Sequence, residues 1–298
     1  MVSQVSKARP GAPAIRGNIT GPYGHGTRHF TSDNLQFCRQ RGNAVGILDL
    51  FSLKGKNALV TGSGRGLGAG MAIAFAQAGA NVTLHSHGKV LGSTIEEVEK
   101  TGVKYICRSG DLCDKAIGHM LVDDTVAAFG SIDILVNNAG TIRRAPAAEH
   151  SEEFWNTVID TNLNSVWFIS QYAGRLMLAQ GHGKIINTAS LLAFQGGILV
   201  PGYAAAKGAV AQLTKALANE WAGKGIQVNA IAPGYMDTDN TAALRADAAR
   251  SAAILSRIPA GRWGVPSDLA GAAVFLASEA SNYVNGHILV VDGGWLCR

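Results

Sequence analysis

The sequence predicts an α/β protein: a single doubly wound parallel sheet of about seven strands, with helices on both faces. One observation is a series of short, apolar, β-branched segments near residues 57–61, 81–86, 103–108, 132–137, 183–188, 226–231 and 287–291. The other is that helical segments separate them, the longest near 151–180 and 203–223. Alternating strands and helices are typical of a parallel sheet. Because the alternation runs unbroken from Asn57 to Asp292, we expect one such domain in the 298 residues.

The first predicted strand runs into a glycine-rich turn and then into an alanine-rich helix. Glycines stand at positions 62, 64, 66 and 68. Glycine permits a tight turn and lets the backbone approach a pyrophosphate at the helix N-terminus. A glycine loop between a strand and a helix is the fingerprint of a Rossmann-type dinucleotide site. The residues expected to contact the dinucleotide here are Gly62, Ser63, Arg65, Gly66, Leu67 and Gly68.

Ser190, Tyr203 and Lys207 are the predicted catalytic side chains. Ser190 follows the strand near 183–188, at the sheet edge where α/β folds bind ligands, and the other two share one helix face. A phenol titrates near ~10, and a neighbouring ammonium favours the phenolate. The pattern predicts proton transfer to or from a substrate oxygen, with Tyr203 as acid or base. Chance spacing and a capping serine are the alternatives; the dinucleotide motif upstream favours catalysis.

Several motifs occur together in order: Thr61-Gly62-x-x-x-Gly66-x-Gly68, Asn137-Asn138-Ala139-Gly140, Asn162, Ser190, Tyr203-x-x-x-Lys207 and Pro233-Gly234. Together they resemble the short-chain dehydrogenase/reductase family, from about residue 51 to the C-terminus. The resemblance implies an NAD(P)-dependent enzyme acting on CH–OH groups, usually a homotetramer. It implies that Ser190 polarises the carbonyl and that Lys207 lowers the pKa of Tyr203 and binds the nicotinamide ribose. Asn162 would hold a water in a proton relay; Asn164 is the alternative, but the following Leu-x-Ser-Val favours Asn162.

The same resemblance assigns the rest of the cofactor site. It implies adenine contacts from Asp111 and Leu112, ribose contacts from Asn138, Ala139 and Gly140, and carboxamide contacts from Pro233, Gly234, Met236 and Thr238. Where NAD-preferring relatives carry an acidic residue after the second strand, this chain has Ser86 and His87. The absence of a carboxylate at this position and the presence of Arg65 nearby weakly favour NADP over NAD. The alternative is that Arg65 and Lys89 are solvated surface charges.

Segments of the second half resemble one branch of the family, the 2-dehydro-3-deoxy-D-gluconate 5-dehydrogenases of uronate catabolism. They are Ile142-Arg143-Arg144, Phe194-Gln-Gly-Gly197, Ile258-Pro-Ala-Gly-Arg-Trp-Gly264 and Asp292-Gly-Gly-Trp295. This resemblance implies a sugar-acid substrate, with interconversion of 3-deoxy-2,5-diketo-hexonate and 2-keto-3-deoxygluconate, and it implies NAD.

A carboxylate substrate needs a cation, and Arg143 or Arg144 can pair with it bidentately. Alternatively, both arginines form salt bridges with a helix or a neighbouring subunit. The further expected substrate residues are Gln195, Asn240 and Arg245, and we expect a helix over 240–258 to form the lid. Other functions left open are reduction of gluconate-type or 3-oxoacyl thioester substrates, and dinucleotide binding without catalysis. A non-catalytic protein would be expected to lose the tyrosine or the lysine.

Charge is divided unevenly along the chain. Residues 1–44 carry six Lys/Arg and one Asp, whereas residues 45–298 carry twenty of each sign, so the net +5 belongs to the first segment. The neutral remainder argues against nucleic-acid binding. The Gly/Pro/Arg-rich segment 1–44 is predicted to be a disordered basic extension to a domain spanning 45–298. If the source is bacterial, we hypothesise that translation begins at Val45, read as methionine.

Three further features concern compartment and metal. No run approaches the ~18 apolar residues of a membrane span. Cysteines 38, 107, 113 and 297 show no metal-ligand spacing. We therefore expect a cytoplasmic protein with reduced thiols, no membrane association and no metal.

Overall fold

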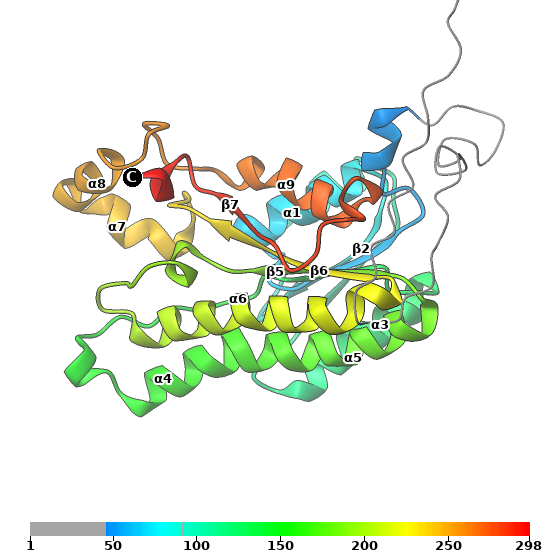
Figure 1. Cartoon of the computed structure of the whole chain (residues 1–298), viewed down its shortest axis with the longest axis horizontal. Helices are drawn as coiled ribbons and strands as arrows, with labels where there is room; N and C mark the ends of the chain where they lie inside the picture. Colours follow the sequence, from blue (N-terminus) through cyan, green and yellow to red (C-terminus); the bar gives the residue numbers. More distant parts are fainter. Residues whose placement is uncertain (1–45, 91) are drawn as a thin grey trace, which may run out of the picture. The chain divides into compact units, whose positions relative to one another are not determined.

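The computed structural model describes residues 46–90 and 92–298; the predicted extension 1–44 and the proposed start at Val45 lie outside these ranges. Seven strands form one parallel sheet in the order β3-β2-β1-β4-β5-β6-β7 (Figure 1). The strands are β1 (Asn57–Val60), β2 (Asn81–Ser86), β3 (Tyr105–Ser109), β4 (Ile134–Asn137), β5 (Gly183–Thr188), β6 (Ile226–Pro233) and β7 (Ile288–Val291). The predicted fold is confirmed. Strand order reverses between β1 and β4, the switch point where such sheets bind ligands.

Helices cover both faces of the sheet. Figure 1 shows α1 (Gly66–Gln77) and α9 (Ala270–Ala277) on one face, where α1 also contacts α2 (Gly92–Glu99). The other face carries α3 (Lys115–Phe129), α5 (Ser165–Gln180) and α6 (Pro201–Trp221). No helix among the described residues is long and apolar enough to span a membrane.

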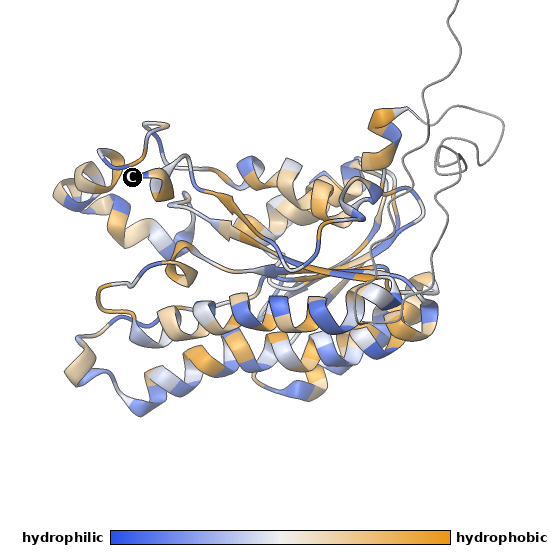
Figure 2. Cartoon of the chain, in the orientation of Figure 1, coloured by the Kyte–Doolittle hydropathy of each residue, from blue (hydrophilic) through white to orange (hydrophobic). Residues whose placement is uncertain are grey.

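The two faces of the sheet belong to two separate apolar cores. Ala58 and Val60 of β1 pack with Phe75 of α1, whereas the intervening Leu59 packs with Leu121 of α3. This alternation is the period of two expected of a strand, with both faces buried as in parallel sheets. In Figure 2, α9, which covers one of these faces, is drawn mainly in the orange tones of hydrophobic residues. A sheet held on both sides provides a rigid base for the loops at its carboxyl edge.

The helix predicted over 151–180 is interrupted. It consists of α4 (Glu152–Ile159), a π-helical turn over Asp160–Asn164, and α5. Ser151 caps the start by accepting a hydrogen bond from Phe154 N at 3.1 Å, and Gly181, with φ +74°, follows the end. A π turn inserts one extra residue into the helical register and is frequent at functional sites. Here it contains Asn162.

The helix predicted over 240–258 is two helices. A 3₁₀ turn (Asp239–Thr241) leads into α7 (Ala242–Ala246), and α8 (Ala248–Leu255) follows directly. Asp247 separates them because its backbone is extended and its carboxylate accepts a hydrogen bond from Arg250 N at 3.0 Å, which caps α8. Beneath this predicted lid a small cluster joins Ile254 and Ile258 to Leu191 and Trp295. The lid therefore rests on the C-terminal segment.

Candidate active site

Ser190, Tyr203 and Lys207 come together at the carboxyl edge of the sheet. Ser190 begins the 3₁₀ turn after β5 and accepts a hydrogen bond from Leu192 N at 3.2 Å. Pro201 starts α6, which brings Tyr203 into its first turn within hydrogen-bond reach of Ser190. Lys207, one turn further on, is 4% exposed, and its Nζ donates to the Thr188 carbonyl at 2.5 Å. The spacing in the sequence therefore produces the predicted cluster.

The electrostatics of Tyr203 differ from the sequence-based expectation. Burial raises the pKa of Tyr203, while the hydrogen bond with Ser190 and the charge of Arg144 act in the opposite direction. The Nζ of Lys207 lies 5.6 Å from the centre of the tyrosine ring. Burial lowers the pKa of Lys207 itself to about 8. In this geometry Arg144 is a cation whose charge favours the phenolate, and the part of Lys207 in lowering the pKa of Tyr203 stays a prediction.

Asn162, rather than Asn164, lies against the site. Its Oδ1 accepts from Thr141 N and its Nδ2 donates to Thr141 O, both at 2.8 Å, and the residue is fully buried. Asn164 instead donates to Asp160 Oδ1 at 2.7 Å. The Asn162 side chain thus fixes the loop that follows Gly140. Its part in a proton relay stays a prediction.

The glycine loop between β1 and α1 has no room for larger side chains. A Cβ on Gly68 would lie 2.3 Å from Gly62 O and 2.4 Å from Asn138 Nδ2, and Gly62 and Gly66 have φ values of +64° and +58°. Only glycine tolerates this combination of contact and backbone conformation. The loop is a bare backbone turn at the N-terminus of α1, which fits a pyrophosphate. The geometry therefore suits the dinucleotide predicted from the motif.

Thr61, which precedes this loop, links it to the loop after β4. Its hydroxyl accepts from Asn138 N at 2.9 Å and Ala139 N at 3.1 Å, and it donates to Val136 O at 3.2 Å. Asn138 makes a second connection between the two loops, because its Nδ2 donates to Gly62 O at 3.2 Å. The predicted cofactor residues Asn138 and Ala139 are thus held beside the glycine loop, at the switch point between β1 and β4.

The residues predicted for the adenosine end fall into two groups. Ser86 borders the glycine loop, because a Cβ on Gly64 would lie 2.8 Å from Ser86 Cβ. His87 and Asp111 are both solvent-exposed, with His87 Nε2 3.9 Å from Asp111 Oδ2. In contrast, the side chains of Ser63 and Leu112 are buried: the serine donates to Val60 O and the leucine packs in the core. These two residues can meet a cofactor only through their backbone.

The segment after β6 borders the same loop. A Cβ on Gly66 would lie 3.7 Å from Thr238 Cγ2, which places Thr238 beside the glycine loop. Gly234 donates to Val291 O at 2.9 Å and leaves no space for a side chain against Asp292. Met236 is buried in the core and packs on Gly264, so its side chain faces away from solvent. Of this set, Thr238 has the position expected of a cofactor contact.

The two adjacent arginines have different surroundings. Arg143 donates to Thr141 Oγ1 at 2.8 Å and to Ile142 O at 3.3 Å, within its own loop. Arg144 donates to the Asn240 carbonyl at 3.1 Å, and its charge acts on Tyr203. Neither arginine forms a salt bridge with a carboxylate within residues 46–90 and 92–298. Arg144 is therefore the cation placed between the proton donor and the lid.

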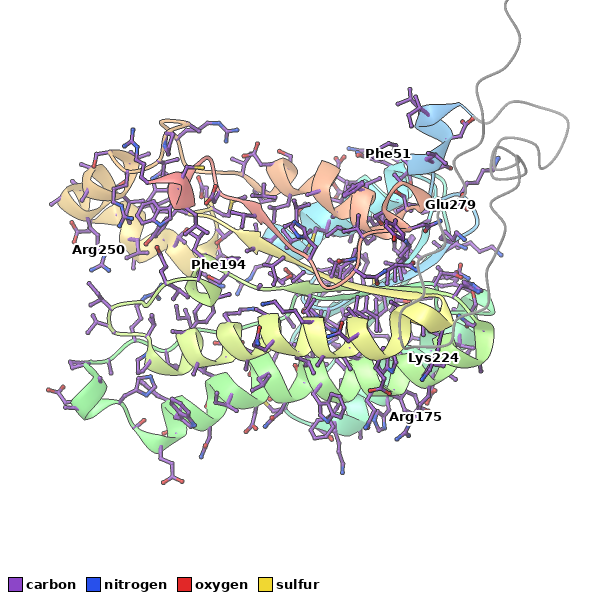
Figure 3. The ribbon with its side chains drawn as sticks, viewed as in Figure 1. Phe51, Arg175, Phe194, Lys224, Arg250 and Glu279 are labelled. Carbon is purple, nitrogen blue, oxygen red and sulfur yellow. The ribbon has the colours of Figure 1, made fainter. Side chains whose placement is uncertain are left out.

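Other predicted residues of the site have partners within the protein. Arg245 forms a salt bridge with Asp237 at 2.7 Å, and Arg65 forms one with Asp239 at 2.9 Å. Gln195 follows Phe194 on the segment joining β5 to α6, where Figure 3 labels Phe194, and Gln195 Oε1 accepts from Trp295 Nε1 at 3.3 Å. Arg245 and Gln195 thus support the lid and the C-terminal segment. The described ranges contain no cluster of three or more His, Cys, Asp or Glu that could hold a metal.

Sequence reasoning missed His85 and Thr141. His85 is buried beneath the glycine loop, with its ring hydrogen-bonded to two loops, and Thr141 is the backbone partner of Asn162. A histidine near the end of a strand that leads to the binding edge was the available signal for His85. Nothing local distinguishes Thr141.

Comparison with known proteins places this site in a family. A family model described as enoyl-(acyl carrier protein) reductase matches residues 62–296. The 2-dehydro-3-deoxy-D-gluconate 5-dehydrogenase of Pseudoalteromonas atlantica is 58% identical over 254 residues, which is 85% of this chain and 100% of that protein. The chain belongs to the short-chain dehydrogenase/reductase family. The enzyme of the same name from Bacillus subtilis is 56% identical over 252 residues, covering 84% of this chain and 98% of the relative.

A solved structure agrees with the family assignment. The gluconate 5-dehydrogenase of Burkholderia cenocepacia, in complex with NADP and tartrate, superposes with a TM-score of 0.81 at 42% identity. The match covers 85% of this chain and 100% of that one. This short-chain dehydrogenase/reductase is therefore an NAD(P)-dependent oxidoreductase, as the motifs predicted.

Proposed function

We propose that this enzyme transfers hydride between NAD(P)(H) and a keto or hydroxy group of a sugar acid, interconverting 3-deoxy-2,5-diketo-hexonate and 2-keto-3-deoxygluconate. The observation that carries the proposal is a proton donor beside a cation. Tyr203 lies in reach of Ser190, and the Arg144 guanidinium is close enough to lower the pKa of the phenol. A cation at this place suits a substrate that carries a carboxylate. The names of the relatives at 58% and 56% identity support the same substrate class.

Each side chain of the cluster has a distinct part in this reaction. A bound nicotinamide supplies or accepts the hydride. Burial raises the pKa of Tyr203, so the phenol keeps its proton at neutral pH and can donate it to the substrate oxygen during reduction. During oxidation Tyr203 takes the proton, and Ser190 and Arg144 favour the phenolate that this step requires. Lys207 donates to Thr188 O, and its ammonium lies 5.6 Å from the centre of the Tyr203 ring.

We propose NADP(H) as the preferred cofactor. Support comes from the end of β2, where Ser86 and His87 leave no carboxylate to accept the ribose hydroxyl. Arg65 projects from the glycine loop nearby and is mostly exposed, so its guanidinium can exchange Asp239 for a 2′-phosphate. The resemblance to an NAD-using branch points the other way, and kinetics decide between them.

One steady-state panel tests the substrate and cofactor together. NADH and NADPH are each assayed with 3-deoxy-2,5-diketo-hexonate, 5-ketogluconate and a 3-oxoacyl thioester. We expect the highest kcat/KM with the 3-deoxy sugar acid and NADPH. A higher value with 5-ketogluconate would instead favour the activity named for the Burkholderia cenocepacia structure. A higher kcat/KM with the thioester would contradict the proposal that the enzyme recognises a substrate carboxylate.

Tyr203→Phe tests the mechanism separately from the substrate. The variant keeps the ring and loses the proton donor, so turnover should fall by about 10²–10⁴-fold while dinucleotide binding persists. Near-normal turnover in this variant would exclude Tyr203 as the acid–base group.

We further propose a cytoplasmic homotetramer in which residues 1–44 are dispensable and the domain spans 45–298. The family resemblance supports the assembly, and the absence of family motifs in 1–44 supports the domain limit. Light scattering measures the assembly. Activity of a chain lacking residues 1–44, and the intact mass of the native protein, test the extension and the start at Val45.

A further inference from the structure

We infer that His85 is a positioning residue for the dinucleotide, whose ring holds the glycine loop and the adenine-side loop in fixed relation. The inference rests on the dinucleotide site proposed above. His85 is the penultimate residue of β2 and is 1% exposed. A buried polar ring needs hydrogen-bond partners, and both of its partners are backbone groups of the two predicted cofactor loops.

The ring connects these loops directly. Gly62 N donates to His85 Nδ1 at 3.2 Å, and His85 Nε2 lies 3.1 Å from Gly110 O. Because Nδ1 accepts, the proton of the neutral ring is on Nε2, which donates to the carbonyl. Burial lowers the pKa of His85, so the ring stays in this neutral form at pH 7. Adding a proton would set Nδ1–H against the N–H of Gly62.

The main chain of His85 reinforces the same connection. Ser63 N donates to His85 O at 2.7 Å, and His85 N donates to Ser63 Oγ at 2.9 Å. One residue of β2 therefore contacts two successive residues of the glycine loop. This also explains why the Ser63 side chain points inward rather than towards a cofactor.

Both loops lie where a small displacement would matter. Gly62 has φ +64° and contacts Ala139 so closely that an added Cβ would lie 2.8 Å from Ala139 Cα. Gly110 immediately precedes Asp111 and Leu112, the predicted adenine contacts. The ring thus fixes the separation between the pyrophosphate side and the adenine side of one ligand. Loops held in the binding conformation beforehand lose less entropy when the ligand binds.

None of the hydrogen bonds of His85 involves Ser190, Tyr203 or Lys207. A positioning role therefore predicts a loss of dinucleotide affinity with little loss of turnover once the cofactor saturates the enzyme. A role in general stability alone predicts no such selective loss of dinucleotide affinity. The two can be separated with a control residue that is equally buried and equally bonded.

Asn229 provides that control. It is 1% exposed, and its side chain also bridges two backbone groups, donating to Val284 O at 2.8 Å and accepting from His287 N at 3.0 Å. These partners precede β7 and belong to neither cofactor loop. Asn229→Leu and His85→Leu each remove two such hydrogen bonds from a buried site, so their cost to folding should be similar.

The experiment measures binding rather than activity alone. NADPH and NADH are titrated by fluorescence, and ADP-ribose, which lacks the nicotinamide, by calorimetry. His85→Leu should raise the Kd of all three by about 10-fold or more, because it leaves buried backbone groups unpaired. Asn229→Leu should bind like wild type. His85→Asn should recover part of the affinity, because its Oδ1 can still accept from Gly62 N. In both His85 variants, kcat at saturating cofactor should change by less than about 3-fold.

The outcomes distinguish the two proposals. If wild type binds dinucleotide and His85→Leu binds it equally well, the role of His85 is overturned and the proposed function stands. The role is also overturned if Asn229→Leu loses as much affinity, or if ADP-ribose binding is unchanged in His85→Leu. A wild-type protein that binds neither dinucleotide nor ADP-ribose would overturn the proposed function and this inference with it.

Discussion

Lys207→Met should make the protein more stable and leave it inactive. The ammonium is 4% exposed, and burial lowers its pKa to about 8 from an ordinary value of 10.5. At 1.36 kcal/mol per pKa unit, that difference means that keeping Lys207 charged at pH 7 costs about 3 kcal/mol of folding free energy. Methionine removes this cost, but it leaves the Thr188 carbonyl without its donor, at about 1–3 kcal/mol. We expect a net stabilisation of about 1 kcal/mol, or ~2–4 °C in Tm.

The pH dependence of this gain provides the sharper test. Between pH 8 and 10.5 the unfolded chain still holds the lysine proton that the folded protein has released. Wild-type stability therefore rises with pH across this window, so the stability difference should shift by about 3 kcal/mol and Lys207→Met should become the less stable protein near pH 10. Urea unfolding followed by tryptophan fluorescence at pH 7, 8, 9 and 10, at one protein concentration, measures both variants. A difference that does not change with pH, or a variant less stable than wild type at pH 7, would refute the reasoning.

Three further predictions concern the binding site. Gly68→Ala would place a Cβ 2.3 Å from Gly62 O, so α1 must shift. The Kd for dinucleotide should therefore rise by about 10-fold or more. Gly271→Ala is the control, because a Cβ there meets nothing within 4 Å. Ser86→Asp should repel a 2′-phosphate and so shift the ratio of kcat/KM for NADPH to kcat/KM for NADH towards NADH. The uncharged Ser86→Asn should leave that ratio unchanged. An unchanged ratio in Ser86→Asp would place Ser86 away from the cofactor. Arg144→Met should raise KM for an acid substrate by about 10-fold and spare a neutral diketone. Arg143→Met should change KM less, because that guanidinium is bonded within its own loop; equal losses on both substrates would make the arginines structural.

The strands were predictable to within about two residues because buried parallel strands form apolar runs that end abruptly at the ligand edge. The interruptions of the helices were not predicted. The π turn at Asp160–Asn164 contains Asn162, which bonds Thr141 in a segment 21 residues away, so no local pattern indicates it. The break at Asp247 did have a local signal, an aspartate that can cap the helix after it, but the surrounding alanines favoured one continuous helix.

The site was predictable where its chemistry depends on local spacing. Tyr203 and Lys207 lie one helical turn apart, so their proximity follows from the sequence alone. Arg143 and Arg144 are neighbours with different partners, and only the position of the lid shows that Arg144 contacts Asn240. His85 could not be assigned from the sequence, since its role comes from Gly62 and Gly110, which belong to two other strand–loop junctions.

Three buried polar residues around the site share one arrangement. Thr61, His85 and Asn162 are all buried, and each uses its side chain to bond the backbone of a loop at the carboxyl edge. A loop without its own regular hydrogen bonds gains a defined shape from such contacts. The sheet therefore supplies the base of the site, while these buried side chains set the positions of the loops above it. Substitutions at these positions should consequently affect ligand affinity more than the identity of the fold.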